Sequence, residues 1–154
     1  MASVAGSALY IRQDGKVVAD SDRELAQITQ MADYIFLLLF CGFLTHEMDG
    51  VKRREWRLVS GLRKLDQGAV GDWFIFLHWP ILAALLWLCF MASEPLLGYG
   101  RLGFAAFSMV HPVLHWVLRN HSESHFQGPW SRTINAGTGL LALSYLVLWF
   151  SSTT

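Results

Sequence analysis

Four long apolar segments, separated by short polar stretches, dominate the 154-residue chain. A helix needs about 20 mostly apolar residues to cross a bilayer. We therefore expect membrane-spanning helices at about 25–48, 73–93, 102–118 and 133–151. The first segment is the least regular, because Asp33 interrupts it, so a re-entrant helix that enters only part of the membrane is the alternative there.

Four spans joined by short loops predict an all-α fold, a bundle of four antiparallel transmembrane helices. We expect this domain to cover residues 25–154 and to follow a mobile N-terminal tail at 1–24. Gly137, Gly139 and Ser144 give the last helix a small-residue edge, which favours close contact with a neighbouring helix.

Composition and charge support a membrane protein. Hydrophobic residues make up 53% of the sequence and the formal net charge is zero, so no nucleic-acid partner is expected. Basic residues gather between segments one and two and between segments three and four. The positive-inside rule then places both loops in the cytoplasm and both termini outside.

The first loop is expected to contact the bilayer, through anionic lipids, with six basic residues: Lys52, Arg53, Arg54, Arg57, Arg63 and Lys64. Val51, Leu58, Leu62 and Leu65 recur at helical spacing among them, which is typical of an amphipathic helix lying on a membrane surface. A plain connecting loop that only sets the topology explains the same charges equally well.

Four histidines on three predicted helices fall at similar depths in the same half of the membrane. At a rise of about 1.5 Å per residue, His46, His78, His111 and His115 lie about 6 to 12 Å below the cytoplasmic boundary. His111 and His115 also share one face of their helix. We therefore expect imidazoles from separate segments to meet beneath one membrane surface.

Imidazole nitrogens combined with carboxylate oxygens suit Zn²⁺ or non-haem iron better than Mg²⁺ or Ca²⁺. The candidate metal ligands are His46, Asp49, His78, His111 and His115. Glu47 is the candidate catalytic residue, as a general acid and base, because a partly desolvated carboxylate is suited to exchanging a proton near neutral pH.

Two stretches near the first segment carry a resemblance. Thr45-His46-Glu47-Met48-Asp49, followed by Glu55-Trp56-Arg57-Leu58, resembles the Thr-His-Glu-(Leu/Met)-Asp and Glu-Trp-Arg-Leu signature of small bacterial integral membrane proteins of unknown function. Two later stretches fit the same family: His78-Trp79-Pro80 and His111-Pro112-Val113-Leu114-His115-Trp116. The resemblance extends roughly from Met31 to Phe150, with Gly50 where alanine is usual, and implies a four-helix membrane fold without an activity.

The function we expect is a metal-dependent enzyme that acts near the cytoplasmic face on a lipid-like substrate. One alternative is a non-catalytic membrane subunit or assembly factor, in which Glu47, Asp49 and Glu55 pair with nearby arginines in a structural polar network. A proton-coupled transporter is the other alternative, because ionisable groups at membrane depth also mark proton paths.

Overall fold

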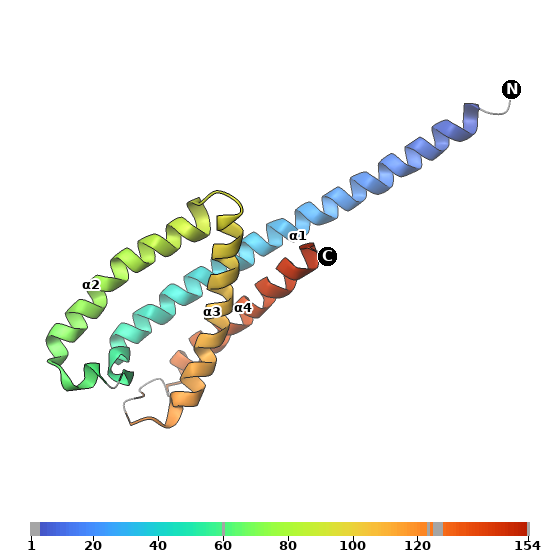
Figure 1. The fold of residues 1–154 in the computed structure, drawn as a ribbon. Helices are drawn as coiled ribbons and strands as arrows, with labels where there is room; N and C mark the ends of the chain where they lie inside the picture. Colours follow the sequence, from blue (N-terminus) through green and yellow to red (C-terminus); the bar gives the residue numbers. More distant parts are fainter. Residues whose placement is uncertain (1–3, 60, 123, 125–127, 154) are drawn as a thin grey trace.

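The computed structural model describes residues 4–59, 61–122, 124 and 128–153, and every regular element in this part of the chain is a helix (Figure 1). The all-α prediction is therefore confirmed. In chain order the elements are α1 Val4–Arg53, the 3₁₀ turns η1 Glu55–Leu58 and η2 Leu62–Lys64, α2 Gln67–Leu86, the π-helical η3 Trp87–Met91, α3 Leu96–Val117, the 3₁₀ turn η4 Leu118–Asn120, and α4 Pro129–Thr153.

Within the residues that the structure describes, three helical segments are long and apolar enough to cross a membrane: Arg23–Arg53, Gln67–Met91 and Pro129–Ser152. They contain the predicted spans 25–48 and 133–151 and most of 73–93. The predicted span 102–118 falls almost entirely within α3, which is not among the three because its arginine and two histidines lower its hydropathy. A fourth span therefore stays a prediction.

The first helix is longer than its apolar segment. It begins at Val4, inside the region expected to be a tail, and its first part extends beyond the other helices (Figure 1). The mobility of residues 1–24 stays a prediction. Further along the helix, the Asp33 carboxylate accepts a hydrogen bond from Arg101 of α3. This ion pair gives the exposed Asp33 carboxylate a partner on α3, so the charge of Asp33 does not by itself require a re-entrant helix.

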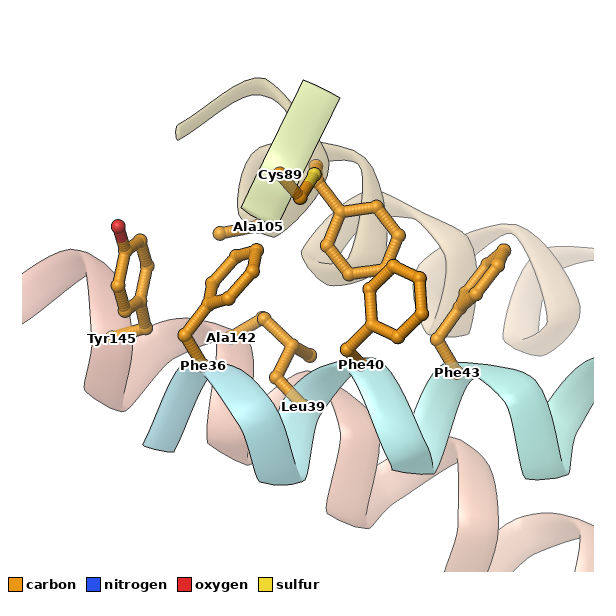
Figure 2. Close-up of a cluster of buried hydrophobic side chains, with 9 residues drawn as sticks. Phe36, Leu39, Phe40, Phe43, Cys89, Ala105, Ala142 and Tyr145 are labelled. Atoms are coloured by element: carbon orange, nitrogen blue, oxygen red, sulfur yellow. The ribbon is translucent and has the colours of Figure 1, made fainter. Parts of the chain in front are cut away.

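The core is built on one face of α1. Phe36, Leu39, Phe40 and Phe43 follow the spacing of a helical stripe and are all buried. Figure 2 labels them beside four further core residues contributed by the other helices, Cys89, Ala105, Ala142 and Tyr145. Phe104 of α3 belongs to the same cluster. Both α1 and α3 pack along α4, so these three helices form the closely packed part of the bundle.

Small residues let α4 approach its neighbours closely. A Cβ atom on Gly139 would lie 3.2 Å from Pro112 of α3, and one on Gly42 of α1 would lie 3.1 Å from the Thr138 hydroxyl. A Cβ atom on Gly137 would meet nothing within 4 Å. The predicted small-residue edge is thus used at Gly139 and left open at Gly137.

The second helix stands apart from this packed unit. α2 makes few close backbone contacts with the packed helices. It is joined to them through η1 and η3 at its ends and through the contact of His78 with Glu47 of α1, and Gly71 is its buried residue. Its large side chains, among them Trp73, Phe76 and Trp79, are exposed in the protein alone. A continuous apolar surface of this kind is what lipid tails cover in a membrane.

The loop between α1 and α2 does not form the amphipathic helix considered above. Arg54 adopts a left-handed conformation, with φ 57° and ψ 53°, which ends α1, and two short 3₁₀ turns follow. Trp56 is buried beside Gly71 of α2 and donates a hydrogen bond to Gln67 Oε1 at 3.2 Å. The loop is therefore held against the start of α2 by an aromatic anchor.

We predict that Gly100→Ala destabilises the protein by about 1–3 kcal/mol, because the added Cβ atom overpacks a filled site. That atom would lie 2.9 Å from the Leu88 carbonyl oxygen and 2.5 Å from Leu88 Cγ. Gly103→Ala is the matched control on the same helix, since a Cβ atom there meets nothing within 4 Å. Thermal unfolding in detergent would measure both, and equal midpoints would contradict this packing.

Candidate metal centre

Three histidines and one glutamate meet at the end of the bundle where α1 and α3 both finish. His46 lies on α1, His111 and His115 lie on α3, and Glu55 is the first residue of η1. Each residue offers one ligating atom, and these four atoms all lie within 4.8 Å of one another. The predicted convergence of histidines from separate segments is present for these three.

The spacing of the three imidazole Nε2 atoms and the Glu55 carboxylate oxygens suits a single cation. His111 Nε2 lies 2.7 Å from His46 Nε2 and 3.1 Å from His115 Nε2. Glu55 Oε1 lies 3.2 Å from His115 Nε2 and 3.6 Å from His111 Nε2, and Oε2 lies 3.9 Å from His46 Nε2. Tetrahedral ligands about 2.0–2.1 Å from Zn²⁺ are separated by about 3.3 Å. The observed separations fall on both sides of this value.

Local backbone geometry brings these side chains together. Four-residue spacing puts His111 and His115 on one face of α3, opposite His46. The left-handed turn at Arg54 reverses the chain so that Glu55 faces the rings. Gly50 leaves room for the carboxylate, because a Cβ atom there would lie 2.5 Å from Glu55 Oε2.

The cluster is shielded and carries a negative charge. His46 is 2% exposed and His115 is 7% exposed. Burial by itself would raise the pKa of Glu55, but the hydrogen bond with His115 and the charges of the three histidines together lower that pKa below its usual value. The carboxylate is therefore ionised at neutral pH, as a metal ligand must be.

Glu47 and His78 form a second polar pair beside the cluster. His78 Nε2 lies 2.8 Å from Glu47 Oε2, and His78 Nδ1 lies 2.6 Å from the Phe74 carbonyl oxygen. A carbonyl oxygen can only accept, so Nδ1 carries a proton. The Nε2–Oε2 contact then holds one further proton between imidazole and carboxylate, an arrangement suited to acid–base chemistry.

Both polar groups face one cavity of about 600 Å³ between α2 and α3. Glu47, Glu55, His78 and His111 line it together, and its remaining walls are mostly apolar. The apolar lining comes from α1, η1, α2, η3 and α3 and includes Phe43, Trp56, Phe74, Ile81, Leu85, Leu88, Gly103, Phe104 and Phe107. The volume is in the range of ordinary ligand pockets.

Two residues expected among the ligands lie outside the group of four. His78 is occupied by Glu47, as described above. Asp49 accepts a hydrogen bond from the Ser131 hydroxyl of α4 and pairs with Arg53 at 3.3 Å. Asp49 thus links α1 to α4, and its partners indicate a structural role.

The residue pattern does not identify Glu55 as a member of this cluster. Glu55 lies among basic residues and outside the apolar segments, which favours pairing with nearby arginines instead. Its position in the Glu55–Leu58 stretch, which contributes to the family resemblance, was the available signal. Local spacing could not show that it turns back toward His46.

A family model described as "Family of unknown function (DUF6713)" matches residues 32–152. This region contains all four histidines and both glutamates of the site, and it nearly coincides with the region of the resemblance noted from the sequence. No curated protein and no solved structure matches the chain.

We predict that Asp49→Ala lowers the free energy of unfolding by about 1–3 kcal/mol, because it leaves the buried Ser131 hydroxyl without its acceptor. The same change should leave the metal content unchanged. Asp72→Ala, at an exposed position on α2, is the control. Loss of metal from a folded Asp49→Ala protein would instead identify Asp49 as a metal ligand.

Proposed function

The chain belongs to this family of unknown function (DUF6713), and we propose that it is a metal-dependent membrane enzyme whose cation is held by His46, Glu55, His111 and His115. The observation that supports this proposal is the approach of four ligating atoms to within 4.8 Å of one another. Three imidazole nitrogens and one carboxylate suit Zn²⁺ or Fe²⁺.

The proposed reaction is hydrolysis of an amphiphilic substrate. A cation at this site would lower the pKa of a bound water and so supply the nucleophile. Glu47 would accept the proton that water loses and deliver it to the leaving group, so that water adds across the cleaved bond. His78 would hold Glu47 in position through their 2.8 Å contact.

The site is proposed to lie near the cytoplasmic surface of a bacterial inner membrane. The loop that follows α1 is rich in Lys and Arg, and the positive-inside rule then assigns this end of the bundle to the cytoplasm. The same basic residues are proposed to contact anionic lipid headgroups. A substrate that resides in the membrane would reach the cavity without leaving the bilayer.

One observation favours a different class of function. Glu55 contacts all three rings, so the cluster could join α1, η1 and α3 as a polar clasp without a cation. The protein would then be a non-catalytic membrane subunit or assembly factor. Metal content and stability, measured on the same variants, separate the two functions.

We predict that the purified full chain holds one Zn²⁺ or iron ion, and that His111→Ala and Glu55→Gln weaken its binding by about tenfold or more. Elemental analysis by mass spectrometry would measure the metal, and circular dichroism would show that the variants remain helical. His121→Ala, in the loop after α3, is the control and should retain the metal. Metal-free wild-type protein that unfolds on the same substitutions would establish the clasp.

We predict that Glu47→Gln retains the metal but slows turnover by about 10²–10⁴-fold, the usual contribution of a general acid or base. Release of nitrophenol from a long-chain para-nitrophenyl ester in detergent would measure turnover. Glu24→Gln, at an exposed position on α1, is the control. Unchanged turnover in Glu47→Gln would exclude Glu47 as the general base.

A further inference from the structure

We propose that the cavity between α2 and α3 binds a single hydrocarbon chain, so that the substrate is a linear acyl amphiphile with its polar group at the metal centre. This inference rests on the proposed function for the chemistry at the polar end. The binding of the hydrocarbon chain does not depend on that chemistry. It is inferred from the walls, the length and the open side of the cavity.

One wall of the cavity is a helical stripe on α2 that continues to Leu88 of η3, and α3 lies opposite it. On α2, Phe74, His78, Ile81 and Leu85 recur at helical spacing and all line the cavity. From His78 to Leu88 the wall spans ten residues, or about 15 Å at about 1.5 Å per residue. Polar side chains of the site lie at the start of this wall and apolar ones follow along it. This gradient matches a molecule with one polar end and one extended apolar tail.

The cavity is open along its side. Ile81 and Tyr99 line it and are 52% and 67% exposed. Because α2 is attached mainly at its two ends, this opening lies between helices and faces the region where lipid tails would be. A tail can therefore enter sideways from the bilayer, whereas a polar solute would gain little from these walls.

Gly103 controls how much of the cavity is available. It lines the α3 wall, and a Cβ atom there would meet nothing within 4 Å. Nearby Gly100, by contrast, lies against Leu88, where α3 and η3 approach closely. A large side chain at position 103 would thus fill the middle of the cavity without disturbing the packing or the metal ligands.

The test uses the full chain in phosphatidylcholine vesicles and a series of fatty acids from octanoic to palmitic acid, each with a diazirine on its terminal carbon. After illumination, peptide mass spectrometry locates the adducts. We expect octanoic acid to label the middle of the wall, between Leu82 and Leu85, and palmitic acid to label the far end near Leu88. Gly103→Leu should reduce labelling by palmitic acid about tenfold, as expected for lost space in an apolar pocket, and spare octanoic acid.

Gly137→Leu is the matched control, because position 137 also has open space around its Cβ position but lies on α4, away from the cavity. Gly103→Ala should give a smaller effect of the same sign if the leucine variant fails to fold. Adducts spread evenly over exposed residues such as Trp79, or equal labelling of the Gly103 and Gly137 variants, would overturn the chain site. Cavity labelling of a metal-free protein would uphold the chain site and overturn the proposed enzyme.

Discussion

The contact between the Glu55 carboxylate and three imidazoles is the interaction on which the site depends. An ionised carboxylate is costly to shield from water unless opposite charges or hydrogen-bond donors surround it. His46, His111 and His115 supply those partners from two helices that are far apart in sequence. The loop after α1 must therefore fold back over the end of the bundle, where it also covers one end of the cavity.

The rest of the molecule consists of a packed unit, formed by α1, α3 and α4, and the helix α2, which forms one side of the cavity. Aromatic residues of α1 interlock with α3 and α4, and a rigid scaffold of this kind fixes the positions of side chains at its end. The Phe43 and Phe104 rings, 5.0 Å apart, lie at the boundary between this core and the cavity. α2 is not packed in this way. It is attached mainly by its ends, and the cavity lies between it and α3. The positions of the clustered side chains and the space of the cavity are thus set by different helices.

Three ionisable groups of α1, namely Asp33, Glu47 and Asp49, each have a partner on another element. Arg101 binds Asp33 of α1 and the Cys89 carbonyl oxygen, and its guanidinium lies 5.1 Å from the Phe36 ring centre. Glu47 is paired with His78 in the same way. Such pairing is what membrane depth demands. The cluster of His46, Glu55, His111 and His115 differs, because four groups that could bind one metal ion converge there, which is more than pairing requires.

The sequence by itself determined the helical class and the approximate bounds of three apolar helices, because hydropathy is a local property. The depth of the histidines in a membrane stays a prediction from the rise per residue. The sequence also indicated that His111 and His115 share a face. Only the tertiary structure decided that Glu55 joins them while Asp49 turns to α4. The position of Glu55 depends on the left-handed turn at Arg54. A non-glycine residue rarely adopts this conformation, and no residue pattern predicts it. The site depends equally on the separation of α2 from α3, which is set by contacts at the two ends of α2.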